Sequence, residues 1–318
     1  MKKTLYCGVL LLIVFLAFSC KKKEEDTTKP TLSGLVIDSD HSTYMGVGTT
    51  IHVTPKTDNI VSSDTTFPEK IGIYFLFSGT SSQRDTTTKD ASVSNPTYDL
   101  TLDEPGNYTL YCYAFGGDAF YNASTSISFT VVDPATALTG IPADLPTVTI
   151  DGHSFRTVTM EGKTWLANNL YGTATGTNYQ DSEILASLFG LYYTWTEAQT
   201  ACPEGWHLPT GAEFDQCLGS VAGDAMVNAQ FVDVDMWSYW PEVPITNERK
   251  FCALPVGYRD YTVESLPEDG YKTYACFWTA DNNEDLGVFR YIYERQNVIQ
   301  KGQGDKNTLA MSVRCVKD

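Results

Sequence analysis

The sequence has little positive charge, few histidines and none of the short motifs that mark common enzyme classes. Its 318 residues include 22 Lys and Arg against 39 Asp and Glu, for a net charge of −17, and only 4 His. The absence of a basic stripe past residue 30 argues against a nucleic-acid partner. The chain also lacks a His-Glu-x-x-His motif, a nucleophile elbow, a phosphate-binding loop, a dinucleotide fingerprint and a Cys-x-x-Cys pair. We therefore expect no enzyme activity and no cofactor, although so many acids would also allow a glycosidase-like carboxylate pair.

Residues 1–20 have the composition of a targeting segment. Lys2 and Lys3 precede an apolar run over 5–18, which is shorter than the ~20 residues of a membrane-spanning helix. The run ends in "LAFSC", which resembles the lipobox of bacterial lipoproteins and implies a lipoprotein signal peptide with lipidation of Cys20. Acyl chains would make the membrane a partner without a transmembrane helix. The alternative is an ordinary signal peptide with an unrelated cysteine.

Residues 21–33 are charged and polar and begin "KKKEEDTTKP". Such a segment buries little apolar area, so we predict a flexible tether. Its acidic run beside the cysteine resembles the surface-export signal of Bacteroidota lipoproteins. That resemblance implies a lipid-anchored protein exposed on the outer membrane, whereas the plainer alternative is a solvated spacer.

Residues 34–133 contain short runs of β-branched and aromatic residues separated by turn-forming residues, which is typical of a β-sandwich. The stretch "DEPGNYTLYCYAF" places Tyr108 after a turn and is similar to the tyrosine corner of immunoglobulin-like domains. Leu110 stands where antibody domains have a cysteine, so that intersheet disulfide is missing. Cys112 is expected to be a buried thiol. The resemblance implies an all-β immunoglobulin-like spacer.

Residues 134–145 read as a linker, and residues 146–318 as a second, α+β domain. One Asp-Gly pair and one Glu-Gly pair predict two hairpin turns near its start. A helix ends near Cys202, and Thr210 with Glu213 forms a capping box that starts another. The spacing of Phe214, Cys217, Leu218 and Val221 predicts one apolar face on that helix. Strands are expected in "KFCALPVGY", "YACFWTA", "VFRYIYE" and "AMSVRCVK".

Several motifs of the second domain resemble the Fibrobacter succinogenes major paralogous domain. They are "GKTWLANNL", "YYTWTEAQTACPEGWHLPTGAEFD", "FCALPVGYRD", "CFWTA" and "SVRCVKD", in the order of that family. The resemblance covers residues 146–318 and implies a C-type-lectin-like fold. It also implies a disulfide between Cys202 and Cys315. The calcium–sugar motifs of true C-type lectins are missing, so their calcium-bridged sugar site is not implied.

The cysteines and His207 are expected to be structural. If Cys202 is in the implied disulfide, it is not a nucleophile, and His207 is a hydrogen-bonded scaffold residue. Cys217 falls on the apolar face of its helix. A Cys252–Cys276 bridge is an open alternative, since sequence alone does not fix connectivity.

Candidate ligand contacts lie in an insert and in the strand that follows it. Exposed aromatic rings stack on sugars or anchor protein partners, and the alternative is that the insert folds back and buries them. The candidates are Trp237, Tyr239, Trp240, Tyr258, Arg259 and Asp260. A weaker calcium candidate comprises Asp281, Asn283 and Asp285, for which an acidic turn is the simpler interpretation. We expect a non-enzymatic surface lipoprotein that binds carbohydrate, or alternatively a protein-interaction or adhesin module.

Overall fold

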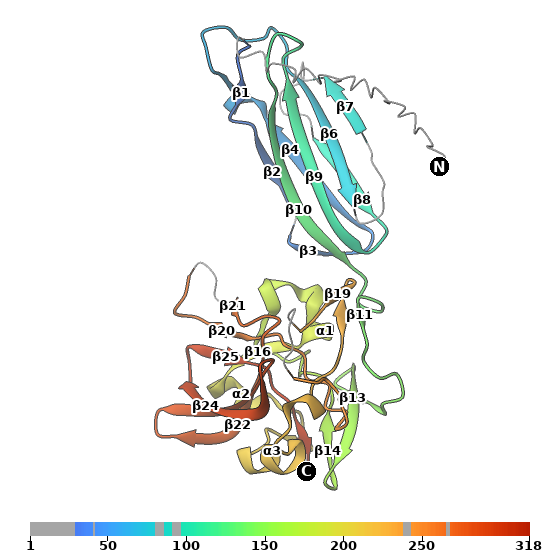
Figure 1. Cartoon of the computed structure of the whole chain (residues 1–318), viewed down its shortest axis with the longest axis vertical. Helices are drawn as coiled ribbons and strands as arrows, with labels where there is room; N and C mark the ends of the chain where they lie inside the picture. The colour runs from blue at the N-terminus through green and yellow to red at the C-terminus, as the bar shows by residue number, and fades with distance from the viewer. Residues whose placement is uncertain (1–28, 41, 80–85, 91–96, 238–242, 265–267) are drawn as a thin grey trace, which may run out of the picture.

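Strands dominate the part of the chain that the structure describes, and its helices are few and short (Figure 1). Residues 30–132 form a β-sandwich, which we call the N-terminal sandwich, and the residues after it form a second β-rich body, the C-terminal region. The computed structural model describes residues 29–40, 42–79, 86–90, 97–237, 243–264 and 268–318.

The N-terminal sandwich is built from a three-stranded and a five-stranded sheet with a short strand pair at one end. The sheet orders are β2-β4-β8, β3-β10-β9-β6-β7 and β1-β5. The elements are β1 (Leu32–Ser33), β2 (Val36–Ser39), β3 (Tyr44–Gly46), β4 (Thr49–Lys56), η1 (Thr57–Asn59), β5 (Val61–Ser62), β6 (Gly72–Gly79), β7 (Thr86–Asp90), β8 (Tyr98–Leu102), β9 (Gly106–Phe115) and β10 (Ala123–Val132).

Alternation along β6 and β9 places every second side chain in the core. Across the two sheets, the Tyr98 ring stacks on Phe75 with 4.4 Å between centroids. Each fully buried ring or branched side chain contributes roughly 1.5–3 kcal/mol. The Tyr108 hydroxyl donates to the Glu104 carbonyl, four residues earlier, at 2.7 Å. Cys112 is buried and free, as expected.

The C-terminal region contains four small sheets. Their orders are β11-β18-β19, β12-β13-β14-β26-β17, β15-β16-β25-β20-β21 and β22-β23-β24. The strands are β11 (Leu138–Thr139), β12 (Thr147–Ile150), β13 (His153–Met160), β14 (Lys163–Leu166), β15 (Thr177–Asn178), β16 (Leu191–Thr194), β17 (Trp206–His207), β18 (Gln230–Phe231), β19 (Val234–Asp235), β20 (Tyr258–Asp260), β21 (Glu268–Asp269), β22 (Tyr274–Asn283), β23 (Leu286–Tyr293), β24 (Gln296–Asp305), β25 (Leu309–Met311) and β26 (Val316–Lys317). The helices are η2 (Tyr179–Asp181), η3 (Glu183–Leu185), α1 (Ala186–Phe189), α2 (Trp195–Ala201), α3 (Gly211–Leu218) and η4 (Ala222–Asp224).

The two predicted hairpins open the C-terminal region. Asp151 and Gly152 have φ of 50° and 84° between β12 and β13, and Glu161 and Gly162 have φ of 47° and 79° between β13 and β14. Consecutive positive φ values are those of the two-residue turns whose twist matches antiparallel strands. The hairpins therefore follow directly from local sequence.

Helix α3 starts where the sequence predicts, and α2 has a matching start. Thr210 and Glu213 exchange side-chain and backbone hydrogen bonds in a capping box, and Thr194 does the same for α2. Phe214, Cys217 and Leu218 face the core as expected. Val221 does not, because α3 ends at Leu218 and leaves Val221 exposed.

Three expectations about chain organisation are corrected by the structure. The tether is shorter than 21–33, because β1 pairs with β5 and Leu32 is buried in the sandwich core. Residues 134–145 are not a free linker, since β11 pairs with β18 and Leu145 is buried in the C-terminal core. Residues 250–257 form no strand; only the last residue of the predicted run begins β20.

The two bodies touch where β3 meets the C-terminal region. The ring of Tyr44 on β3 lies 6.0 Å from that of Phe231 on β18, and Tyr44 packs against the C-terminal core. Among the described residues, no helix is both long enough and apolar enough to cross a membrane.

Candidate binding groove and its surroundings

An open cavity of about 440 Å³ lies on the exposed face of the β22-β23-β24 sheet. We call it the tyrosine groove, because aromatic rings line it beside polar side chains. Its lining comprises Tyr258, Asp260, Tyr274, Cys276, Phe289, Tyr291, Lys301, Gly302, Gln303, Leu309 and Met311. Strands β22, β23 and β24 thus meet β20 and β25 at one surface.

Strand alternation places the rings of the groove on one face. Cys276 pairs with Tyr291, and Tyr274 pairs with Tyr293, so the odd residues of β23 and the even residues of β22 share that face. The Tyr274 ring stacks on Tyr293 at 4.8 Å and lies edge-on to Tyr291 at 6.0 Å. These contacts hold the rings in fixed orientations while each stays partly exposed.

Gly302 gives the Phe289 ring its position in the groove. A Cβ at Gly302 would lie 2.2 Å from Cζ of Phe289, so the ring rests directly on the backbone of β24. A larger residue would push the ring outward into the groove. The glycine therefore sets the depth of this wall.

Polar groups at the rim are already oriented by neighbours. The Tyr258 hydroxyl donates to Asp269 at 2.9 Å, and Asp260 Oδ1 accepts from the Thr262 amide at 2.9 Å. Burial, and next the hydrogen bond with Asp269, raises the pKa of Tyr258 to about 12. This phenol therefore stays protonated at neutral pH.

The β24 wall of the groove comprises Lys301, Gly302 and Gln303. Lys301 pairs with Arg290 and Gln303 with Val288, so both side chains point to the face opposite Phe289. There Lys301 Nζ donates to Asp215 at 2.9 Å, and Gln303 Oε1 accepts from Asn283 at 3.2 Å. The polar side chains of the groove are therefore Tyr258 and Asp260, and aromatic faces beside them suit a ligand with both C–H and hydroxyl surfaces.

The structure divides the predicted ligand residues. Tyr258 and Asp260 lie in the tyrosine groove, but Arg259 points to the other side of β20 and forms an ion pair with Asp181 at 2.7 Å. The expectation for Trp237 is wrong, because its side chain is 4% exposed and its Nε1 donates to the Val227 carbonyl. Tyr239 and Trp240 lie outside the described residues.

Three aromatic residues of the groove, Tyr274, Phe289 and Tyr291, were not predicted as ligand contacts from the sequence. They lie in runs predicted as strands, and the alternation of aromatics at 289, 291 and 293 was the available signal. That pattern does not distinguish a buried face from an exposed one.

The implied disulfide is present between Cys202, at the end of α2, and Cys315, just before β26. Their Cα atoms lie 5.8 Å apart and are separated by 113 residues in the sequence. Cys202 is therefore not a free nucleophile beside His207. The alternative Cys252–Cys276 bridge is wrong: both thiols are free and buried, and they belong to different hydrophobic clusters.

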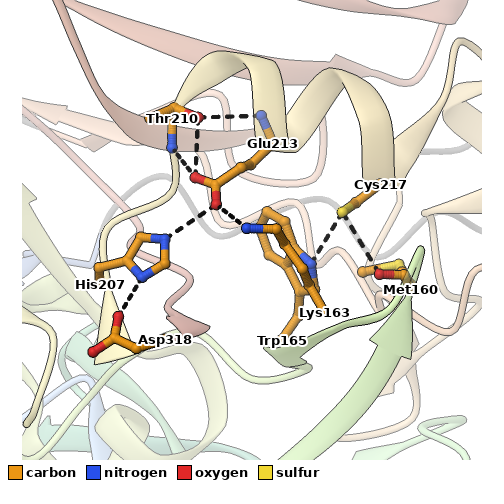
Figure 2. A network of polar contacts seen from close by, with 8 residues as sticks. All are labelled: Met160, Lys163, Trp165, His207, Thr210, Glu213, Cys217 and Asp318. Atoms are coloured by element: carbon orange, nitrogen blue, oxygen red, sulfur yellow. Dashed lines mark hydrogen bonds and ion pairs between the residues drawn. The ribbon is translucent and has the colours of Figure 1, made fainter. Parts of the chain in front are cut away.

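His207 joins the C-terminal residue to helix α3 (Figure 2). Its Nδ1 lies 2.6 Å from Asp318, and its Nε2 lies 3.1 Å from Glu213 Oε1. Lys163 donates to the same Glu213 oxygen at 2.7 Å. The other oxygen of Glu213 accepts from the Thr210 amide at 2.8 Å. This network ties β14, β17, α3 and the chain end together.

The network sets the charge of Glu213 and continues into the core. Although burial opposes it, hydrogen bonds from Lys163, Thr210 and His207 lower the pKa of Glu213 to about 2. Beneath it, Trp165 Nε1 donates to the buried Cys217 sulfur at 3.2 Å (Figure 2). His207 is therefore hydrogen-bonded through both ring nitrogens to acidic neighbours, which is the kind of contact expected of a scaffold residue.

Two of the three side chains of the weak calcium candidate form hydrogen bonds within the protein. Asp281 Oδ2 accepts from the Gly211 amide at 3.0 Å, and Asn283 donates to Gln303. Asp285 lies in the turn between β22 and β23. In the described ranges, no three His, Cys, Asp or Glu side chains gather to hold a metal ion.

Comparison with known proteins gives one family. A model described as the Fibrobacter succinogenes major domain matches residues 150–317, more than half of the chain. No curated protein matches.

Similarity to solved structures is low. A superoxide reductase (neelaredoxin) from Ignicoccus hospitalis is 10% identical, with a TM-score of 0.22 over 35% of this chain and 89% of that chain. A family 76 glycoside hydrolase from a bovine Bacteroides thetaiotaomicron strain is 12% identical, with a TM-score of 0.23 over 54% of this chain and 32% of the hydrolase. Neither score is high enough to carry an argument.

Proposed function

Since the chain belongs to the Fibrobacter succinogenes major domain family, we propose that its C-terminal region binds a carbohydrate in the tyrosine groove. The observation that carries this proposal is the composition of one open cavity. Partly exposed rings of Tyr274, Phe289 and Tyr291 lie beside Asp260 and other polar groups. Sugar rings present C–H faces to aromatic side chains and hydroxyls to fixed donors and acceptors.

The protein would act by binding rather than by catalysis. Cys202 is in a disulfide, and the four free cysteines of the described chain are buried. Burial raises the pKa of the Cys112 thiol to about 12 and also raises that of Cys276, in the groove floor. Thiolates are therefore scarce at neutral pH, which disfavours nucleophilic chemistry.

The wider arrangement follows from the same proposal. Lipid on Cys20 would hold the chain at the outer surface of an outer membrane, and an immunoglobulin-like sandwich would raise the C-terminal region above it. The tyrosine-corner contact of Tyr108 supports the immunoglobulin-like assignment. The Cys202–Cys315 bond, between a helix end and the last strand, supports a C-type-lectin-like assignment for the C-terminal region.

A second candidate function is protein binding through the N-terminal sandwich. On the outer face of its larger sheet, Tyr74 stacks on Tyr113 at 4.6 Å, and Tyr111 and Phe115 adjoin them. All four rings are partly exposed. A partly exposed aromatic surface is typical of protein–protein contacts.

Glycan-array binding of the mature chain, residues 21–318, tests the leading proposal. Tyr291→Ala and Tyr274→Ala should each weaken binding by about tenfold, because one aromatic contact contributes about 1.5 kcal/mol. Tyr113→Ala is the matched control, since it removes a partly exposed tyrosine from the sandwich and should leave binding unchanged.

Two results would oppose the sugar proposal. One is the absence of binding to any glycan. The other is glycan binding that is insensitive to Tyr291→Ala. A protein partner lost with Tyr113→Ala and retained with Tyr291→Ala would instead support the second candidate.

A further inference from the structure

A second cavity, distinct from the tyrosine groove, has an unusual charge. It measures about 140 Å³ and lies where residues 134–141 cross the C-terminal core. Its lining comprises Pro134, Ala135, Leu138, Ile141, Arg156, Ala167, Asn168, Asn169, Ser187, Leu188, Cys252, Leu254 and Arg314. This lining holds two arginines and no acid, in a chain with 39 acids against 22 basic residues. We call it the arginine pocket.

Arg314 forms the floor of the arginine pocket and is 1% exposed. All of its hydrogen bonds go to neutral acceptors. These are Asn169 Oδ1 at 2.7 Å and the carbonyls of Leu166 at 3.1 Å, Phe251 at 2.7 Å and Cys252 at 3.0 Å. A buried ion without a counter-ion is costly even when it is hydrogen-bonded. Burial accordingly lowers the pKa of Arg314 to about 9.

Arg156 adds a second positive charge to the same cavity. It is half-buried, and within the described residues neither arginine forms an ion pair with a carboxylate. The Asn168 Oδ1 accepts from the Arg156 amide at 2.6 Å, which leaves the Asn168 amide nitrogen to donate elsewhere. Ser187, Pro134 and Ala135 are exposed and mark the mouth.

We propose that the arginine pocket binds a small oxyanion: a carboxylate, sulfate or phosphate group. The anion would accept from the Arg156 guanidinium, whose planar donors match the geometry of such oxygens. It would also offset the charge of Arg314, which has one N–H donor left after its four hydrogen bonds. Asn168 and Ser187 supply further donors. Because residues 134–141 form one wall, an occupied pocket would also fix the segment joining the N-terminal sandwich to the C-terminal region. This site is independent of sugar binding in the tyrosine groove.

Thermal unfolding of the mature chain, residues 21–318, at constant ionic strength tests this inference. Sodium sulfate, phosphate or glucuronate should raise the unfolding temperature of the C-terminal region by about 3 °C or more relative to sodium chloride, since a ligand stabilises the state that binds it. A response to glucuronate alone indicates the carboxylate of an acidic sugar. A response to sulfate or phosphate indicates a free inorganic ion.

Arg156→Gln should abolish this shift. In chloride it should unfold at about the wild-type temperature, because the Arg156 side chain forms no ion pair within the described residues that the change would break; a purely structural arginine would instead lower that temperature. Arg295→Gln, at an exposed position, is the matched control and should respond like the wild type. The inference is overturned if none of the three anions stabilises the protein, or if Arg156→Gln responds as fully as the wild type. Selenate-soaked crystals give a second measurement, in which an anomalous peak between Arg156 and Arg314 is expected and an empty pocket contradicts the proposal.

Discussion

The N-terminal sandwich and the C-terminal region bury different kinds of side chain. Among the described residues, the sandwich core consists of aliphatic and aromatic side chains and one cysteine, whereas every buried Ser, Thr, Asn or charged side chain belongs to the C-terminal region. Those residues are Thr157, Asn169, Thr279, Arg290, Glu294, Ser312 and Arg314. An apolar core needs only the right alternation, but a buried polar group needs a particular partner. The C-terminal region is thus specified by long-range contacts, and both candidate ligand sites occur in it.

The largest effect on stability is expected when the disulfide is removed in the double variant Cys202→Ser with Cys315→Ser. The chain-entropy treatment gives a loss of about 4–5 kcal/mol for closing a loop of 113 residues. All six tryptophans lie in the C-terminal region, so tryptophan fluorescence during urea unfolding reports on that region alone. Its transition should move to lower urea, while the sandwich transition, followed by the NMR ring signals of Tyr74 and Tyr113, should stay in place.

Cys112→Ser, which alters a free thiol in the sandwich, is the control for that double variant. It should leave the tryptophan transition unchanged. Equal shifts of both transitions in the disulfide variant would show that the two bodies unfold as one unit, and the contrast would fail.

The next largest effect is expected from Asn169→Ala. The Asn169 amide donates to the Phe189 carbonyl at 2.7 Å and to Ser312 at 3.1 Å, and its oxygen accepts from Arg314. Leaving these buried groups without partners should cost about 2–4 kcal/mol in the free energy of unfolding of the C-terminal region.

Asn107→Ala is the matched asparagine change in the sandwich. Asn107 is exposed and accepts from Thr130, so its loss should change stability by no more than about 0.5 kcal/mol. If the two variants cost the same, buried polar contacts do not distinguish the two parts of the chain.

A smaller effect is expected on acidification, through Glu213. The pKa of Glu213 is about 2 in the folded protein against 4.5 for an ordinary Glu. Its ionised form therefore contributes fully to the free energy of unfolding above pH 4.5, and this contribution is lost as the pH falls towards 2. Glu213→Gln should cost about 1–2 kcal/mol at pH 7, through loss of the Lys163 ion pair and of the charge on the capping carboxylate, although Gln can still accept from the Thr210 amide. The variant should also lose less stability than the wild type between pH 4.5 and 2. An unchanged acid dependence would rule out this role.

Local patterns made part of the fold predictable. Alternation identified most sandwich strands, and the Thr210–Glu213 pair correctly started α3, because both signals depend on near neighbours. Residues 250–257 were wrongly predicted as a strand. Their carbonyls instead bind Arg314, more than 60 residues away, and no local pattern shows that contact.

The candidate sites were harder to predict for the same reason. Trp237 was chosen because it lies in an insert, yet the insert packs its ring into the core. Tyr258 and Asp260 were found, but Tyr274 and Tyr291 were not, because alternation identifies a face without telling whether another layer covers it. Only assembly of β20, β22, β23 and β24 shows that this face stays open.

Ring-resolved NMR of the tyrosines during titration with a glycan identified on the array tests the tyrosine groove most directly. The account predicts that the ring signals of Tyr258, Tyr274 and Tyr291 shift on titration, whereas those of Tyr74 and Tyr113 on the sandwich do not. Shifts confined to the sandwich tyrosines, or saturable binding without any shift in the groove tyrosines, would contradict it.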